Sequence, residues 1–249
     1  MYWLTLNRPA RRNALTPSLA RSLAGEIEVA GNRDDIRAVV LRGAGGHFCA
    51  GLDLHWLRSL GEAPTVSQLQ HGMSDFQSAV TAVVRCPVPV VAALEGTVAG
   101  FGLDLALACD IRLAAAGAAF TSAFARMGLI PDGGSTFTLP RLAGLGQALR
   151  LLLAGDTVDA ERARAIGLVE DVADPGSFED RLRELFEGFA GAAPGSIRTI
   201  KRLVRAADVG ALEQALAAEG AAQVQALQSP EFRRRLEAFT ARTARAGGA

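Results

Sequence analysis

Two glycine-rich stretches, His47-Phe48-Cys49-Ala50-Gly51-Leu52-Asp53-Leu54 and Gly96-Thr97-Val98-Ala99-Gly100-Phe101-Gly102-Leu103-Asp104, carry most of the information in this chain. Each places small residues where a predicted strand gives way to a turn or a helix. Small residues there let a ligand approach the backbone and leave N–H groups free to point at it. Two N–H groups that converge on one point form an oxyanion hole, which stabilises negative charge on a carbonyl oxygen. The two stretches therefore predict chemistry through an enolate or a tetrahedral oxyanion.

Predicted strands and helices alternate around these stretches, which favours an α/β fold. Short apolar runs predict strands over residues 2–6, 38–41, 88–94 and 110–115. Helical spacing predicts helices over residues 17–30, with Thr16 as N-cap, over residues 66–84 and from about Gly102 onward. From about Phe178 the pattern is almost wholly helical, with a break at Pro194-Gly195. We therefore expect a core over residues 1–190 and a helical region over residues 191–249.

The composition argues against several classes of function. The 249 residues carry 26 basic and 26 acidic side chains, so nothing indicates a nucleic acid or an anionic membrane surface as partner. The N-terminus does not resemble a signal peptide, and the longest apolar run, Val88 to Leu94, is too short to span a membrane. Cys49, Cys86 and Cys109 form no CxxC pair, which favours reduced thiols, a cytoplasmic protein and no metal site.

Several further motifs resemble the crotonase, or enoyl-CoA hydratase/isomerase, superfamily. The matching segments follow the family order over nearly the whole chain: Leu4-Thr5-Leu6-Asn7-Arg8-Pro9, Arg12-Asn13-Ala14-Leu15, the two glycine-rich stretches, Gly128-Leu129-Ile130-Pro131-Asp132-Gly133-Gly134, Pro140-Arg141-Leu142 and Ala163-Arg164-Ala165-Ile166-Gly167-Leu168-Val169. The resemblance implies a spiral of ββα units as the core, with a C-terminal helical region that serves oligomerisation and closes the CoA site. It also implies trimers that often pair into hexamers, a CoA thioester as substrate, and no separate cofactor.

The resemblance also implies roles for particular residues. The oxyanion hole would consist of the backbone N–H groups of Leu52 and Phe101. Lys201 stands where the family often places a cation near the CoA nucleotide, and a solvated helix charge is the alternative. The remaining residues expected to contact the substrate lie next to the oxyanion donors or face the acyl group: Ala50, Gly51, Asp53, Gly100 and Phe124.

The carboxylates of this chain depart from the hydratase pattern. Hydratases of the family use two glutamates, and these align with Asp104 and Phe124. Because hydration is assigned to both carboxylates acting on one water, Phe124 argues against efficient hydration. Asp132 stands where hydratases usually have glycine, and it resembles the carboxylate of dienoyl-CoA isomerases, of the isomerases of phenylacetate breakdown and of 4-chlorobenzoyl-CoA dehalogenase. The structural alternatives are an N-cap for Asp132 and a helix-dipole interaction for Asp104.

We therefore expect a double-bond isomerase that acts on an unsaturated acyl-CoA. Asp132 would be its base, and Asp104 a second acid or base or a group that orients the substrate. A hydratase that relies on Asp104 is the first alternative, and a non-catalytic member that binds acyl-CoA is the second. A thiol nucleophile at Cys49, beside His47 or His55, is disfavoured because a small buried side chain explains Cys49 as well.

Overall fold

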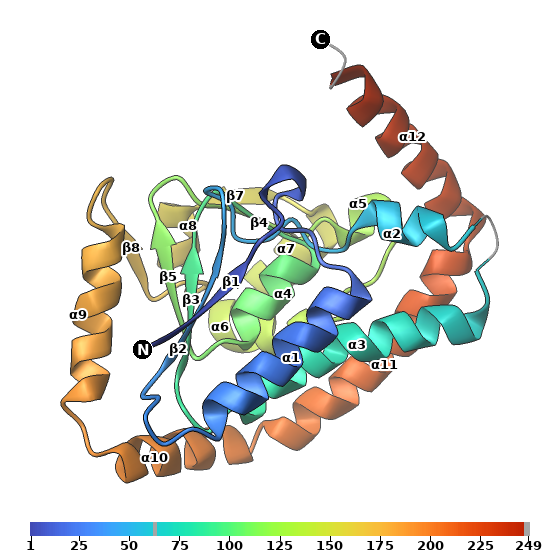
Figure 1. Ribbon diagram of the computed structural model, residues 1–249. Helices are drawn as coiled ribbons and strands as arrows, with labels where there is room; N and C mark the ends of the chain where they lie inside the picture. Colours follow the sequence, from blue (N-terminus) through green and yellow to red (C-terminus); the bar gives the residue numbers. More distant parts are fainter. Residues whose placement is uncertain (62–63, 247–249) are drawn as a thin grey trace.

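The main sheet forms the centre of the computed structural model, which describes residues 1–61 and 64–246 (Figure 1). Its strand order is β1-β2-β3-β5-β8, and each neighbouring pair is parallel. The strands are β1 (Tyr2–Leu6), β2 (Val39–Gly43), β3 (Val90–Leu94), β5 (Ile111–Ala115) and β8 (Asp171–Ala173). Parallel neighbours need crossover connections, and helices supply most of them. The expected α/β class is confirmed.

A smaller sheet contains part of the second glycine-rich stretch and lies next to the first. It consists of β4 (Thr97–Ala99), β6 (Ala119–Thr121) and β7 (Thr157–Asp159), in that order. The strand β4 pairs in parallel with β6, and β7 pairs with β6 in antiparallel fashion. An isolated parallel bridge joins Cys49 to Val98 of β4. The first glycine-rich stretch therefore runs beside the second one.

Alternate residues of the central strands pack against helices on opposite faces of the main sheet. Val39 and Leu41 share a core cluster with Ile27 of α1 (Pro17–Gly31) and with α3 (Val66–Arg85). Val40 belongs instead to a second cluster with Leu182 of α9 (Phe178–Ala190). This period of two explains why residues 38–41 read as a continuous apolar run, since a strand buried on both faces needs no polar side.

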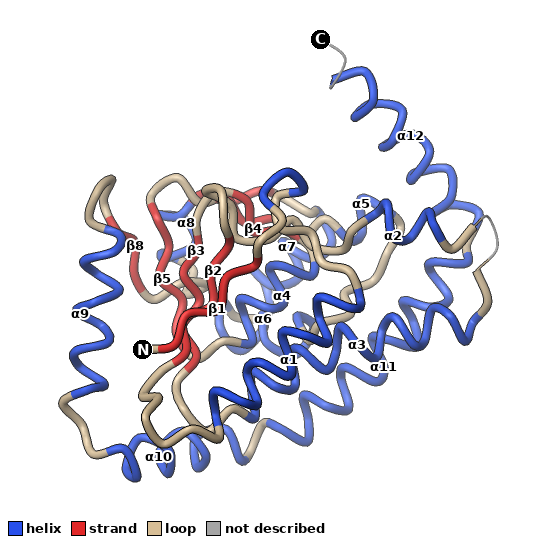
Figure 2. The backbone as a smooth tube through the Cα atoms, in the orientation of Figure 1, coloured by secondary structure: helices blue, strands red, loops and turns tan. Residues whose placement is uncertain are grey.

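The remaining helices lie around the two sheets and form the C-terminal region (Figure 2). The short ones are the 3₁₀ helix Pro9–Arg11, α2 (Leu54–Ser59), α4 (Phe101–Ala108), α5 (Phe124–Met127), α6 (Ser135–Ala143), α7 (Leu145–Ala154) and α8 (Ala160–Ala165). The C-terminal ones are α10 (Pro194–Ala206), α11 (Val209–Gln228) and α12 (Pro230–Ala246). Helix α11 packs along α3 and α6, whereas α12 projects away from the body.

The predicted elements are found close to their expected bounds. Thr16 caps α1 as expected, because its hydroxyl oxygen accepts a hydrogen bond from the backbone N–H of Leu19. Helix α9 ends at Ala190, the last residue of the expected core, but the separate roles of residues 1–190 and 191–249 stay a prediction. Among the described residues, no helix is both long and apolar enough to cross a membrane.

Candidate active site

The two glycine-rich stretches lie side by side at the edge of the smaller sheet. The backbone N–H of Cys49 donates to Thr97 O at 3.0 Å, and that of Ala99 donates to Cys49 O at 2.9 Å. Gly51 has a φ of +94°, and a Cβ atom there would lie 2.8 Å from Ala99 O and 3.2 Å from the backbone nitrogen of Phe101. Glycine is therefore required at position 51, since any side chain would push the two stretches apart.

Two backbone donors are free where these stretches meet. In the described part of the chain, neither the N–H of Leu52 nor that of Phe101 donates a hydrogen bond. Phe101 is the first residue of α4, and N–H groups in a first helical turn have no acceptor within the helix. Gly100, with a φ of +52°, precedes it as the N-cap. Two free donors on adjacent stretches can bind an oxygen that becomes negatively charged.

A cavity of about 490 Å³ opens beside Leu52. Ala50, Leu52 and Asp53 line it from the first glycine-rich stretch, and Phe239 and Thr240 line it from α12. Its rim also carries basic side chains that the sequence analysis did not single out: Arg11, Arg12 and Arg58. Guanidinium groups bind phosphates well, so this rim suits a ligand with phosphate groups.

Asp53 contributes to the loop of this cavity rather than offering a free carboxylate. One carboxylate oxygen accepts from the backbone N–H of His55 at 2.8 Å, which caps α2. The other accepts from Nη2 of Arg8 at 2.6 Å. Asp53 lines the cavity, and its carboxylate holds the loop, so its contact with the substrate stays a prediction.

Asp104 lies in the first turn of α4 and is 1% exposed. Its Oδ2 atom accepts from the backbone N–H of Gly133 at 3.0 Å, and its Oδ1 atom has no partner among the described residues. Burial first, and then the negative charges of Glu219 and Asp132, raise the pKa of Asp104 well above its usual value. A Cβ atom on Gly133 would lie 2.6 Å from Cβ of Asp104 and 2.9 Å from the Phe101 ring, so glycine permits this contact.

Asp132 is also buried, at 3% exposure. Its Oδ2 atom accepts from Nε2 of Gln223 at 3.3 Å, and its Oδ1 atom has no partner in the described residues. Burial raises the pKa of Asp132 to about 7, although the hydrogen bond from Gln223 acts in the opposite direction. A carboxyl group with such a pKa exchanges protons readily near neutral pH.

The N-cap alternative for Asp132 is wrong. Helix α6 begins at Ser135, and its leading N–H groups donate to Glu219 instead, from Gly134 at 2.7 Å and from Thr136 at 2.9 Å. Asp104, in contrast, does lie in a first helical turn, so the dipole alternative describes its position correctly. Burial with an unpartnered oxygen is not explained by a dipole interaction alone.

Aromatic rings rather than a second carboxylate complete the site. Phe124 begins α5 and is buried, so no acid occupies that position. The ring of Phe76 on α3 lies 5.1 Å from that of Phe101 and 6.1 Å from that of Trp56, measured between centroids. These three rings form an apolar wall, and its Phe101 ring faces Gly133 next to Asp104.

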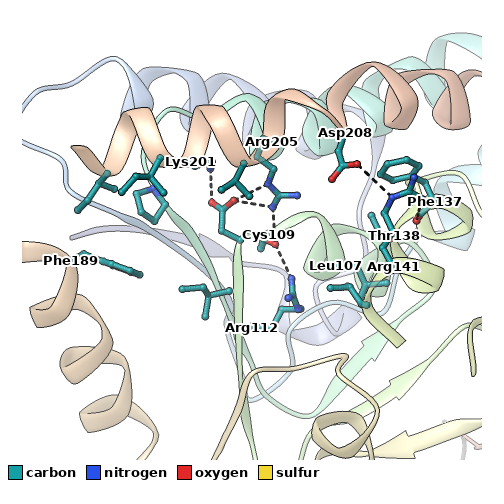
Figure 3. Close-up of a pocket in the computed structure, with 17 residues that line it drawn as sticks. Leu107, Cys109, Arg112, Phe137, Thr138, Arg141, Phe189, Lys201, Arg205 and Asp208 are labelled. Carbon is teal, nitrogen blue, oxygen red and sulfur yellow. Dashed lines mark hydrogen bonds and ion pairs between the residues drawn. The ribbon is translucent and has the colours of Figure 1, made fainter. Parts of the chain in front are cut away.

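Lys201 lies at another place in the fold (Figure 3). Its Nζ atom donates to Oδ2 of Asp110 at 2.5 Å and to Val88 O at 2.9 Å, and Arg205 binds the other carboxylate oxygen of Asp110 at 2.9 Å. Lys201, Asp110 and Arg205 line a separate cavity of about 460 Å³, which shares no residue with the cavity at Leu52. The structure therefore does not bring Lys201 to the Leu52 cavity, and with a side chain 8% exposed it is not a solvated helix charge either.

Cys49 has the properties of a packing residue. It is fully buried, and its Sγ atom donates to Asn13 O at 3.3 Å. Burial raises the pKa of the thiol to about 12, which disfavours the nucleophilic thiolate. His47 accepts from the backbone N–H of Thr97 and so serves the loop. Within residues 1–61 and 64–246, no group of His, Cys, Asp and Glu side chains is arranged to hold a metal ion.

Glu219 and Gln223 of α11 were not predicted from the sequence as functional residues. Neither belongs to a motif, and α11 is rich in alanine. Their spacing along the helix could have indicated them. Buried Leu212, Leu216 and Leu227 recur at helical spacing, and the two polar residues fall on the same buried face of α11. A polar side chain on the apolar face of a helix needs a partner in the core.

Known proteins match both the fold and the order of the motifs. A family model described as enoyl-CoA hydratase/isomerase matches residues 1–245. The 1,2-epoxyphenylacetyl-CoA isomerase of Escherichia coli (strain K12) is 36% identical over 242 residues, covering 96% of this chain and 91% of the relative. A Rhodobacter capsulatus protein named "Probable enoyl-CoA hydratase" is 34% identical over 236 residues, covering 95% and 90%.

A solved structure of similar sequence has the same fold. The crystal structure of enoyl-CoA hydratase from Bacillus halodurans superposes with a TM-score of 0.89 at 27% sequence identity, covering 95% of each chain. The expected crotonase-like fold with C-terminal helices is therefore confirmed. The chain belongs to the enoyl-CoA hydratase/isomerase family of acyl-CoA enzymes, within the crotonase superfamily.

Proposed function

We propose that this protein isomerises a double bond of an unsaturated acyl-CoA, with Asp132 as the base. One observation carries the proposal. Asp132 is a buried carboxylate with an unpartnered oxygen and a pKa raised to about 7, whereas Phe124 occupies the place of the second hydratase carboxylate. A base of this kind suits proton transfer between carbon atoms, which needs no bound water.

The reaction begins with the thioester oxygen bound by the N–H groups of Leu52 and Phe101. The Asp132 carboxylate removes a proton from the α or γ carbon, and the electrons of that C–H bond move into a dienolate whose negative charge reaches the thioester oxygen. Each backbone donor contributes about 3 kcal/mol to stabilising this charge, by analogy with other oxyanion holes. The protonated Asp132 then returns the proton to the other carbon, which shifts the double bond and regenerates the base.

Asp104 serves this reaction as a second acid or as a group that orients the substrate. Its pKa is raised well above the usual value by burial and by its acidic neighbours. A raised pKa favours the protonated form of Asp104, which can donate a hydrogen bond, and this would leave Asp132 as the base of the pair. The apolar wall of Trp56, Phe76 and Phe101 excludes water and so disfavours hydration.

The CoA portion occupies the cavity at Leu52 in this proposal. Ala50, Gly51 and Gly100 give the backbone its close approach to the thioester, and the arginine rim faces the phosphates. Phe239 and Thr240 of α12 close the same cavity, which supports the expected role of the C-terminal helices. A trimer or hexamer is supported by an exposed apolar stripe on α7, formed by Leu145, Leu149 and Leu153.

A hydratase that relies on Asp104 is the second candidate. The relatives include a protein named as a hydratase as well as one named as an isomerase, and Asp104 keeps the position of the first hydratase carboxylate. A member that binds acyl-CoA without turning it over is the third. These candidates differ in their products, since only hydration adds the elements of water.

The test is product analysis with a panel of 2-enoyl-, 3-enoyl-, dienoyl- and aryl-CoA thioesters in deuterated water. We expect NMR spectroscopy to show a shifted double bond and mass spectrometry to show no added water. Asp132→Asn should abolish the shift, with Asp174→Asn, an exposed aspartate, as matched control. A 3-hydroxyacyl-CoA product would favour the hydratase, and binding without turnover of any thioester would favour the non-catalytic member.

A further inference from the structure

We propose that Glu219 and Gln223, one turn apart on α11, are positioning residues that hold the Asp132 carboxylate for proton transfer. The proposal rests on the proposed function of Asp132 as the base. It assigns to the C-terminal helical region a part in the chemistry that goes beyond closing the CoA site. Neither residue touches the reacting atoms, so both act through Asp132 and through the turn that carries it.

Gln223 holds Asp132 from two sides. Its Oε1 atom accepts from the backbone N–H of Ile130 at 2.9 Å, and its Nε2 atom donates to Oδ2 of Asp132 at 3.3 Å. The side chain is 1% exposed, so water cannot replace either bond. One amide therefore fixes the backbone before Asp132 and one of its carboxylate oxygens. The other oxygen, Oδ1, is left without a partner in the described residues and is the atom that remains for a substrate proton.

Glu219 fixes the chain on the other side of Asp132. Its carboxylate accepts from the backbone N–H groups of Gly134 and Thr136 at 2.7 and 2.9 Å, and from the Thr136 hydroxyl at 2.5 Å. Glu219 thus supplies the cap that α6 lacks in its own sequence. Positions 130 and 134, which flank Asp132, are both tied to α11.

The position of α11 is itself held from the opposite side. Gln77 of α3 donates from Nε2 to the carbonyl oxygen of Leu216 at 2.6 Å, one turn before Gly220, whose Cα faces the same Gln77 amide. Leu212 and Leu216 pack into the core against Gly134. The helix that carries Glu219 and Gln223 therefore cannot shift without disturbing the core.

The two residues influence the charge of Asp132 in opposite directions. The hydrogen bond from Gln223 lowers the pKa of Asp132, because it stabilises the ionised form, whereas the negative charge of Glu219 raises it. Asp104, on α4, is the other acidic group near Asp132, and Gln77 faces the same turn from α3. The two residues therefore set the proton affinity of Asp132 in addition to fixing its place.

The test measures the titration of Asp132 directly in the full-length, ligand-free protein. Aspartate carboxyl carbons are labelled with ¹³C, and the Asp132 resonance is assigned by its loss in Asp132→Asn. Gln223→Glu keeps the acceptor for Ile130, removes the donor to Asp132 and adds a negative charge, so the pKa of Asp132 should rise by about one unit or more. Glu219→Gln removes the neighbouring charge and should lower it. Gln225→Glu, at an exposed position of the same helix, is the matched control and should leave it unchanged.

A second variant and a second measurement keep the outcome decisive. Gln223→Met has nearly the same size and removes both hydrogen bonds, so it should also raise the pKa of Asp132 if Gln223→Glu does not fold. In the isomerase assay, the acid limb of kcat/KM should move with the NMR value in each variant.

The proposal is overturned if the Gln223 and Glu219 variants shift the pKa of Asp132 in the same direction, or if no folded variant shifts it. Loss of activity in Asp132→Asn alone would then leave the proposed base intact. If Asp132→Asn stays active while the titrations shift oppositely, the positioning stands and the proposed function fails.

Discussion

Two carboxylates of this molecule lie in opposite electrostatic surroundings: Asp110 is partly buried, and Asp132 is fully buried. Around Asp110, the carboxylate is matched by cations and donors: Lys201 and Arg205 bind its two oxygens, and the backbone N–H of Val90 donates to Oδ2 at 2.8 Å. Around Asp132, the nearby acidic groups are Asp104 and Glu219, and no cation is among the groups that shift its pKa. Asp104 and Asp132 each keep one oxygen without a partner in the described residues.

The difference separates a structural use of buried charge from a functional one. A buried charge is tolerated when it is paired and hydrogen-bonded, and breaking such a pair leaves an uncompensated charge in the core. A buried carboxylate near like charges costs stability and shifts its pKa toward neutrality, which is useful where protons are transferred. We therefore propose that the Asp110 region serves stability and that the Asp132 region serves catalysis.

Removing the charge of Asp132 should have the largest effect on activity. Asp132→Asn keeps the shape of the side chain but cannot accept the substrate proton, so kcat/KM for isomerisation should fall by about 10²–10⁴-fold. Steady-state kinetics on the best thioester of the panel measures this. If Asp132→Asn and the control Asp174→Asn both retain the activity of the wild type, Asp132 is not the base and the contrast with Asp110 does not hold.

Removing the cation at Asp110 should instead affect stability. Lys201→Met removes one of two cations from the partly buried Asp110 carboxylate, while Arg205 and the Val90 N–H remain. The free energy of unfolding should therefore fall by about 1–3 kcal/mol. Chemical denaturation followed by circular dichroism measures this change. The activity of the remaining folded protein should be unchanged, and a selective loss of CoA affinity in a fully stable variant would restore the expected role of Lys201 at the CoA nucleotide.

The two regions should also differ in the pH dependence of stability. The pKa of Asp132 is raised to about 7 in the folded protein, so between its unfolded pKa of about 3.9 and that value the native state binds more protons. Its contribution is fully present below the unfolded pKa and is lost as pH rises through the folded pKa. Asp132→Asn should therefore be more stable than the wild type at pH 8, by a few kcal/mol, with ~1.4 kcal/mol for each unit of pKa shift. If the difference in free energy of unfolding between Asp132→Asn and the wild type is the same at pH 4 and at pH 8, Asp132 has an ordinary pKa.

An exposed ion pair gives the smallest expected effect and calibrates the others. Arg85 and Glu213 join α3 to α11 at 2.5 Å, but both side chains are exposed. Glu213→Gln should change the free energy of unfolding by only ~0.2–1 kcal/mol. A loss as large as that of Lys201→Met would mean that pairing alone, rather than burial with pairing, decides stability in this fold.

The parts of the fold that depend on local pattern could be predicted from the sequence. Apolar runs and caps located β1, α1, α3 and β5, and small residues located the two stretches that lie side by side. The strands β6 and β7 were not predicted, because three residues give too short a period to recognise. Asp104 and Asp132 were singled out through the family resemblance, whereas their burial was not predicted.

The parts of the site that depend on distant contacts could not be predicted. Glu219 lies 85 residues from Gly134 along the chain, and Lys201 lies 91 residues from Asp110. Helical phase indicates that Glu219 is buried, but local sequence does not name the partner of either residue. Lys201 was therefore interpreted from its position in the family, and Glu219 was overlooked. These pairings depend on tertiary packing, which brings residues far apart in the sequence into contact.

The pH dependence of kcat/KM for double-bond isomerisation tests the central claim most directly, because it reports the ionisation of the base in the free enzyme. With a pKa of Asp132 of about 7, kcat/KM should rise with pH and level off above that value. A profile that stays flat from about pH 5 to 9, or an acid limb near the ordinary aspartate pKa of about 3.9, would contradict the assignment of Asp132 as the base.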